Sequence, residues 1–231
     1  VDLGTNGELI LKGRNKFYAT SCATGPAFEG ASLSCGMQAI PGAINSVKIA
    51  GDQTLSAFSM IEASGATGKN PTGICGAGII NAVAQFHEKQ IISPSGVFTT
   101  GRKSYIIVEE NPALGQPSIF ISQKDIRSVQ LGKSALITGI EFLLKKAGLD
   151  RPRKILIAGA FGSHLHKTDL ISLGIIPNIA LEDIETVGNA AGSGAVMALC
   201  DGEYIDQATR MAVEIEIIDL ACNIEFQNMF I

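Results

Sequence analysis

Short apolar segments separated by turn residues fill the first 24 positions of the chain. Residues 1–3, 8–12 and 17–22 have the length and apolar content of strands, with turn signals at 6–7 and 13–15. Tight turns favour antiparallel pairing. The pattern therefore predicts three short hairpin strands that open the fold.

The middle of the chain mixes helical and strand patterns with glycine-rich loops. Pro26 suits the first turn of a helix that we expect to reach about Cys35. Two apolar segments around a Gly-Asp turn predict a β-hairpin, and helical spacing follows a glycine-rich loop. The elements expected here are a hairpin over 44–49 and 55–63, a helix over 79–90 and a strand over 105–108.

Strand and helix patterns alternate in the second half. Residues 124–146 have the periodicity of a long amphipathic helix, with Ser122 as its N-cap and Gly148 as its stop. A buried-type strand at 155–158 and a short strand around Glu185 each precede a glycine-rich segment that should start a helix. Because strand–helix alternation favours parallel pairing, the sequence predicts an α/β fold with a mixed sheet and helices on both faces.

Composition indicates a globular domain and argues against several kinds of partner. The chain has 231 residues, of which 46% are hydrophobic and 17% charged, so it can bury a substantial core. The net charge of −4, the scattered Lys and Arg and the lack of tryptophan argue against nucleic acid and a membrane surface as partners. The five cysteines form no C-x-x-C pair, so we expect free thiols in a reducing cytoplasm and no iron–sulfur or zinc site.

The first candidate site is Asp2-x-Gly4-Thr5-Asn6, which joins a strand end to a hairpin turn. A carboxylate there can hold Mg²⁺ through water, and the turn exposes N–H groups and the Thr5 hydroxyl to phosphate oxygens. The alternative is an ordinary hairpin, since Asp, Asn and Gly are common turn residues. Taken alone, this motif favours the ordinary hairpin.

Two further glycine-rich segments follow strands late in the chain. The segment 159–162, Gly-Ala-Phe-Gly, follows an apolar strand and precedes a helix, which suits the α-phosphate and ribose of a nucleotide. Gly188-Asn189 opens a run of small residues that permits close approach of the backbone. Strand–glycine–helix junctions are common and small residues also serve helix packing, so each signal is weak alone.

Two common nucleotide-binding motifs are absent from the sequence. Residues 73–78 imitate a dinucleotide fingerprint, but they lack the third glycine in register and a clear preceding strand. No G-x-x-x-x-G-K-[ST] segment occurs anywhere, so the chain is not a P-loop enzyme.

The order of the three weak signals is more informative than any one of them. A D-x-G-T hairpin, a glycine segment after a strand and then a small-residue helix resemble the second half of the actin-like ATPase superfamily. That superfamily includes actin, hexokinase, acetate kinase and the large chaperone ATPases, and its two lobes clasp ATP between phosphate loops. The resemblance implies that Asp2 belongs to the second phosphate loop and that the first lobe lies outside this chain.

Five segments narrow the resemblance to one family. Together they resemble the C-terminal domain of the reductive activators of corrinoid proteins over nearly the whole chain. Members carry an iron–sulfur domain beside the ATPase fold and couple ATP hydrolysis to reduction of cob(II)alamin to cob(I)alamin on a partner. The resemblance implies ATP, Mg²⁺ and a corrinoid protein partner, with an iron–sulfur cluster only in a part of the protein outside this chain. The segments are 2–8, 25–30, 73–78, 122–127 and 187–195.

The resemblance also assigns roles to single residues. Asp2 is expected to hold Mg²⁺ and phosphate, and Glu29 to face the cleft as a catalytic carboxylate, with a helix-dipole role as an equal alternative. The long helix should line the adenine pocket, although a solvated charged face explains Asp125, Arg127 and Lys133 better when each is taken alone. The residues expected to contact the nucleotide are Gly4, Thr5, Asn6, Gly76, Gly78, Asp125, Gly159, Ala160, Phe161, Gly162, Gly188 and Asn189.

Three other side chains near these segments have simpler explanations. His164 and His166 could reach the cleft, but surface or helix-capping roles suit them better. Cys75 would be reactive if exposed at a helix N-terminus, but a buried thiol is the interpretation that we prefer.

For domain organisation we expect a single actin-like lobe over 1–231, within a longer protein. Its core should comprise about 1–36 and 123–231, with an inserted subdomain over about 37–122. One alternative is a lobe of an acetate-type kinase, with a pocket for the phosphate acceptor in the inserted part. Another is a docking or dimerisation domain with a vestigial nucleotide site, and the sequence leaves a homodimer open.

Overall fold

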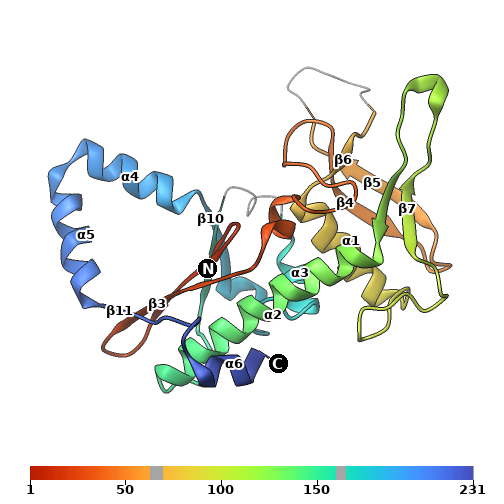
Figure 1. The fold of residues 1–231 in the computed structure, drawn as a ribbon. Helices are drawn as coiled ribbons and strands as arrows, with labels where there is room; N and C mark the ends of the chain where they lie inside the picture. The colour runs from red at the N-terminus through yellow and green to blue at the C-terminus, as the bar shows by residue number, and fades with distance from the viewer. Residues whose placement is uncertain (63–69, 160–164, 231) are drawn as a thin grey trace.

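The computed structural model describes residues 1–62, 70–159 and 165–230, and Figure 1 shows the arrangement of their elements. Its main feature is a six-stranded sheet with the strand order β10-β9-β1-β2-β3-β11. The strands are β1 (Asp2–Leu3), β2 (Gly7–Lys12), β3 (Phe17–Cys22), β9 (Ile155–Ala158), β10 (Ile184–Gly188) and β11 (Ile215–Ile217).

Pairing within this sheet is mixed. β1, β2 and β3 pair antiparallel, whereas β9 pairs parallel with both β1 and β10, and β11 pairs parallel with β3. The prediction of an α/β fold whose mixed sheet opens with hairpin strands is therefore confirmed.

The long helix α2 (Gln123–Lys146) covers one face of this sheet. Its start is fixed by a capping box, in which Ser122 Oγ accepts from Asp125 N and Asp125 Oδ2 accepts from Ser122 N at 2.7 Å. Glycine lets the helix lie close to the strands, because a Cβ on Gly139 would stand 2.9 Å from Leu9 Cδ1 and even closer to Cys22 Sγ. The predicted helix and its Ser122 cap are confirmed.

A second layer of structure is built from residues 43–122. It contains a three-stranded sheet, a two-stranded sheet and the buried helix α1 (Gly76–Glu88). The predicted hairpin and the strand β7 are confirmed, whereas β6 and β8 were not predicted. The strands are β4 (Ala43–Ile49), β5 (Leu55–Met60) and β6 (Gly73–Ile74) in the first sheet, and β7 (Ser104–Val108) and β8 (Ile119–Ser122) in the second.

The two parts share one cluster of buried side chains. Asn81 on α1 accepts from Val47 N at 2.8 Å and donates to Asp169 Oδ2 at 2.8 Å. Asp169 lies on α3 (Lys167–Ser172), which follows β9, so a buried polar contact joins the second layer to the main sheet. The boundaries of an inserted subdomain over 37–122 remain a prediction.

The prediction of a helix from Pro26 to about Cys35 is wrong. Only a short 3₁₀ helix, η1 (Pro26–Glu29), forms there. It ends because Gly30 takes the left-handed conformation, with φ 80°, and lies too close to the Met37 carbonyl to carry a side chain. The described part of the chain also contains the 3₁₀ turns η2 (Pro112–Leu114) and η4 (Leu181–Asp183).

The C-terminal part contains elements that the sequence patterns did not predict in full. α4 (Ala190–Cys200) begins in the predicted small-residue segment, whereas α5 (Gly202–Glu214), β11 and α6 (Ile224–Phe230) were not predicted. α6 packs on α2 through an edge-to-face contact of Phe142 with Phe226, whose ring centroids lie 6.1 Å apart. Figure 1 shows α4 and α5 leaving the sheet after β10 and returning to it at β11. Within the described residues, no helix has the length and apolar character to cross a membrane.

Candidate active site

The candidate site lies where three parallel strands end. β1, β9 and β10 run in the same direction, so their carboxyl ends meet at one edge of the sheet. In open α/β sheets, ligands bind outside the carboxyl ends of the strands. Asp2, Gly159 and Gly188 lie at this edge, although they are far apart in the sequence.

Asp2 and Gly159 are in close contact. A Cβ placed on Gly159 would lie 3.2 Å from Asp2 Oδ1 and would overlap the Leu3 carbonyl. Gly159 has φ 115° and donates its N–H to the Gly188 carbonyl at 3.0 Å. Glycine is therefore required at 159 both by the backbone angle and by the approach of β1.

The loop after β1 is held by its own hydrogen bonds and by one buried hydroxyl. Gly4 N donates to Asn6 O at 3.0 Å, and Thr24 Oγ1 lies 3.1 Å from the carbonyl oxygens of both Gly4 and Thr5. Within the described residues, the N–H groups of Thr5 and Asn6 have no backbone acceptor. The exposed loop can therefore offer two amides and a hydroxyl to an anion.

Glu29 is the second carboxylate at this loop. Thr5 Oγ1 donates to Glu29 Oε2 at 2.7 Å, and Glu29 Oε1 is the side-chain atom nearest to Gly4. The helix-dipole alternative is weakened, because Glu29 ends a four-residue 3₁₀ helix instead of starting a long α-helix. We call Asp2, Gly4, Thr5, Asn6, Glu29, Gly159 and Gly188 the strand-end cluster.

Asn189 and the two glycines of α1 lie beside this cluster, and each has a structural role. Asn189 Oδ1 accepts from Gly192 N at 2.9 Å and caps α4. Gly76 and Gly78 are buried, and a Cβ on either would overlap the carbonyl of Phe28 or of Ile44. Close packing of α1 explains both glycines, and their contact with a nucleotide remains a prediction.

Asp125 and Arg127 on α2 also form hydrogen bonds within the protein. Asp125 is buried, and besides its capping bonds it accepts from Ser34 N at 2.8 Å. Arg127 donates to the Ser95 carbonyl at 2.9 Å. Asp125 therefore anchors the segment around Ser34, which the sequence analysis missed, and its place in an adenine pocket remains a prediction.

Four residues named in the sequence analysis are not among those that the structure describes. Ala160, Phe161, Gly162 and His164 lie outside the described residues. Cys75 is buried at the start of α1, in agreement with the preferred interpretation. Within the described ranges, no group of three or more His, Cys, Asp or Glu is placed to hold a metal ion.

Known proteins resemble this chain in sequence and in fold. A family model described as the C-terminal domain of RACo, the ASKHA domain, matches residues 1–231. The chain belongs to this family. A solved structure named reductive activator for corrinoid, iron–sulfur protein superposes with a TM-score of 0.85 and 28% identity, covering 99% of this chain and 38% of that one.

Two curated relatives agree with this assignment. The corrinoid activation enzyme RamQ of Eubacterium limosum is 35% identical over 224 residues, which are 88% of this chain and 36% of RamQ. The [Co(II) methylated amine-specific corrinoid protein] reductase of Methanosarcina barkeri is 26% identical over 249 residues, covering 100% of this chain and 44% of the relative. The ASKHA domain described here thus spans less than half the length of these relatives.

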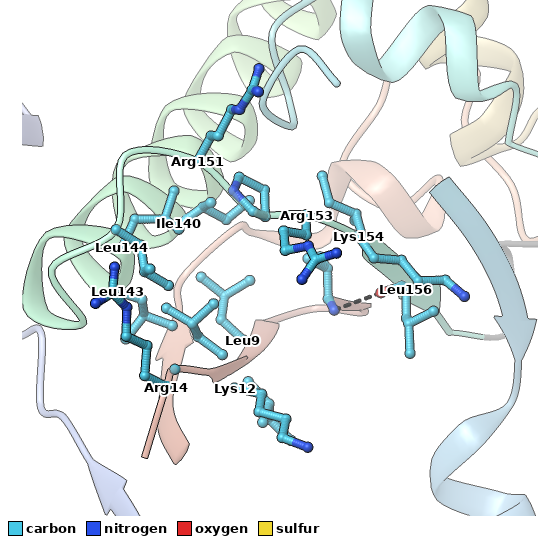
Figure 2. Close-up of a pocket in the computed structure, with 17 residues that line it drawn as sticks. Leu9, Lys12, Arg14, Ile140, Leu143, Leu144, Arg151, Arg153, Lys154 and Leu156 are labelled. Carbon is cyan, nitrogen blue, oxygen red and sulfur yellow. Dashed lines mark hydrogen bonds between the residues drawn. The ribbon is translucent and has the colours of Figure 1, made fainter. Parts of the chain in front are cut away.

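A pocket of the ASKHA domain lies beside Val1, on the N-terminal side of β1. It is a slot of about 730 Å³ between β2 and β9, and it is lined by none of the strand-end cluster. Figure 2 shows Leu9, Ile140 and Leu143 gathered on the side of α2, with Lys12 and Leu156 pointing the other way. Five basic residues border it, namely Lys12, Arg14, Arg151, Arg153 and Lys154.

Val1 closes the inner end of this slot. Its backbone nitrogen donates to the Leu156 carbonyl at 2.8 Å. The slot continues the direction of β1 on the N-terminal side of this strand. Because β1 lies between β2 and β9, the slot is about one strand wide. The slot is thus separate from the strand-end cluster.

Proposed function

We propose that this ASKHA domain binds the phosphates and adenosine of ATP as one half of a two-lobed site in a longer protein. Hydrolysis of ATP there would be coupled to the uphill one-electron reduction of cob(II)alamin on a corrinoid protein. The corrinoid activation and reductase names of the relatives support the reaction and the partner. The observation that carries the proposal for this chain is the contact of Asp2 with Gly159 beside the Thr5–Glu29 hydrogen bond.

The strand-end cluster has the chemistry that phosphoryl transfer to water requires. Such transfer depends on positioning and on charge neutralisation more than on covalent catalysis. The amides of Thr5 and Asn6 would hold phosphate oxygens, while Glu29 fixes the Thr5 hydroxyl and can orient the attacking water. Gly159 and Gly188 would bring their backbone against the α-phosphate and ribose.

Asp2 is the residue proposed to hold Mg²⁺, through water. Within the described residues, no hydrogen-bond donor is recorded at its carboxylate, so both oxygens can accept from the water shell of a metal ion. A magnesium ion at this position would neutralise charge on the β- and γ-phosphates.

The rest of the proposal concerns the longer protein. The iron–sulfur cluster is proposed for a part of the protein outside this chain. A cytoplasmic location is part of the same proposal, and the free thiols of all five cysteines support it. A homodimer also belongs to it.

ATP hydrolysis by the full-length protein with Mg²⁺ tests the proposal. Asp2→Asn keeps the shape of the side chain but removes its charge, and we expect kcat to fall by at least about 100-fold, as for other lost electrostatic groups. Glu110→Gln is the matched control, because Glu110 is an exposed carboxylate in the loop after β7.

Three outcomes are informative. Loss of turnover in Asp2→Asn, with the control unchanged, supports the site. Equal turnover in all three proteins shows that Asp2 does not act on phosphate and contradicts the proposal. Absence of nucleotide binding by the unaltered protein would instead favour the docking-domain alternative.

A further inference from the structure

Thr24 is a buried residue between β3 and η1, and its hydroxyl faces the loop after β1. Thr24 is only 3% exposed, and its Oγ1 lies 3.1 Å from the carbonyl oxygens of both Gly4 and Thr5. A hydroxyl has a single proton, so it is shared between the two acceptors as a three-centre hydrogen bond. One side chain therefore fixes the orientation of two successive peptide groups.

The direction of these two carbonyls sets the direction of the amides that follow them. In a planar trans peptide, the C=O and N–H of one unit point in opposite directions, and the described residues contain no cis peptide bond. The Gly4 carbonyl shares its unit with Thr5 N–H, and the Thr5 carbonyl shares its unit with Asn6 N–H. Both N–H groups therefore point away from the buried Thr24 and towards the exposed side of the loop. Successive N–H groups that face one side of the backbone are an arrangement that binds anions.

Packing holds Thr24 itself in one orientation. A Cβ on Gly7 would stand 3.0 Å from Thr24 Cγ2, so the threonine methyl group occupies the space beside this glycine. Because threonine is β-branched, a methyl group that is fixed in this way also fixes χ1 and thus the hydroxyl. The Thr24 N–H donates to the Cys22 carbonyl at 2.9 Å, which holds the backbone at the same point.

Gly132 on α2 supports Thr24 and η1 together. A Cβ on Gly132 would stand 2.8 Å from the Thr24 carbonyl oxygen and 2.9 Å from Cζ of Phe28. Phe28 is fully buried and directly precedes Glu29 in η1. The same point of α2 therefore helps to place the loop amides and the carboxylate that accepts from Thr5 Oγ1.

We propose that Thr24 is a positioning residue for the phosphates of the nucleotide. Its hydroxyl holds the Gly4 and Thr5 carbonyls inward, so that the amides of Thr5 and Asn6 already face outward before a phosphate binds. Such preorganisation raises affinity, because the loop does not have to be ordered on binding. The inference rests on the function proposed above, since it concerns the same strand-end cluster.

Binding of a non-hydrolysable ATP analogue to the full-length protein with Mg²⁺ tests this inference. Thr24→Val keeps the shape of the side chain but removes the hydroxyl, and we expect it to raise Kd by about tenfold, as for the loss of one buried hydrogen bond. Thr24→Ser keeps the hydroxyl and should restore most of the affinity. Isothermal titration calorimetry measures all three proteins.

Thr20→Val is the matched control. The Thr20 hydroxyl is also buried, but it donates to the Ile218 carbonyl at 2.7 Å and not to the loop. Its removal should therefore lower the thermal midpoint about as much as Thr24→Val does, while nucleotide affinity stays unchanged.

Hydrogen exchange without nucleotide separates a loosened loop from a loosened fold. Gly4 N–H donates to Asn6 O within the loop, so a peptide that contains Gly4 reports on the order of the loop. Mass spectrometry should show faster exchange of this peptide in Thr24→Val and unchanged exchange in Thr24→Ser and Thr20→Val.

The outcomes distinguish this inference from the proposed function. Weaker binding and faster loop exchange in Thr24→Val, with rescue by Thr24→Ser, support the inference. Full affinity or unchanged loop exchange in Thr24→Val would overturn it and leave the proposed function intact. An equal loss of affinity in Thr24→Ser or Thr20→Val would assign the effect to packing or to general stability and would also overturn it. Absence of binding by the unaltered protein would contradict the proposed function itself, on which the inference depends.

Discussion

The helices α2 and α4 contrast two ways in which a helix can relate to the rest of its chain. α2 has a complete capping box, a buried face and glycine positions that fit the strands beneath it. α4 also has a side-chain cap, at Asn189, yet it buries no residue. Local signals therefore specify both helices, but only α2 finds its packing partner within the described chain.

The largest expected difference between the two regions is in thiol reactivity. Cys22 lies beneath α2 at Gly139, and burial raises the pKa of its thiol from 9.0 to about 12. A shift of three units lowers the thiolate fraction at pH 8 by about 1000-fold. We therefore expect iodoacetamide to modify the exposed Cys200 at the end of α4 far faster than Cys22, with mass spectrometry as the readout.

Two outcomes sharpen this comparison. Denaturant should abolish the protection of Cys22, because protection depends on the packing of α2. Fast modification of Cys22 in the folded protein would show that α2 does not seal the sheet.

Matched glycine substitutions in α2 and α4 should change the stability of the protein in opposite directions. Gly139→Ala inserts a methyl group against Cys22 and Leu9, and overpacking of this kind costs about 1–3 kcal/mol. Gly194→Ala in α4 meets no atom within 4 Å and should stabilise the helix by up to about 1 kcal/mol. Urea unfolding of the two variants measures both effects, and equal effects of the same sign would contradict the contrast.

These two helices also show why prediction from sequence succeeded where it did. α2 was predictable because Ser122, Asp125 and its apolar period all belong to one local segment. The helix expected after Pro26 failed because Gly30 must turn left-handed to approach Met37, which is a tertiary requirement. α5 was missed, although its apolar residues have helical spacing. β11 was missed because it is three residues long and depends on pairing with β3.

The candidate site divides in a similar way. Asp2, Gly4, Thr5 and Glu29 could be named from short motifs and from family resemblance. Their grouping could not be deduced from spacing, since the Thr5–Glu29 bond depends on where η1 packs. Thr24, which holds the loop after β1, was missed because a buried threonine has no distinctive sequence signal. The glycines of α1 resembled a ligand loop, although close helix packing requires them as well.

The smallest expected effect concerns the point where the chain returns to the sheet at β11, after α4 and α5. Lys16, just before β3, forms an exposed ion pair with Glu216 on β11 at 2.7 Å, and the hydrogen bond from Lys16 lowers the pKa of Glu216. Because its folded pKa lies below the unfolded value, Glu216 stabilises the fold at neutral pH, and this contribution is lost as the pH falls through the folded pKa. Exposed pairs contribute little and are screened by salt. Glu216→Gln should therefore lower the thermal midpoint only slightly at pH 7, and the difference should vanish in high salt or at pH 3. A large loss at pH 7 that persists in high salt would mean that Glu216 stabilises β11 by more than an exposed ion pair.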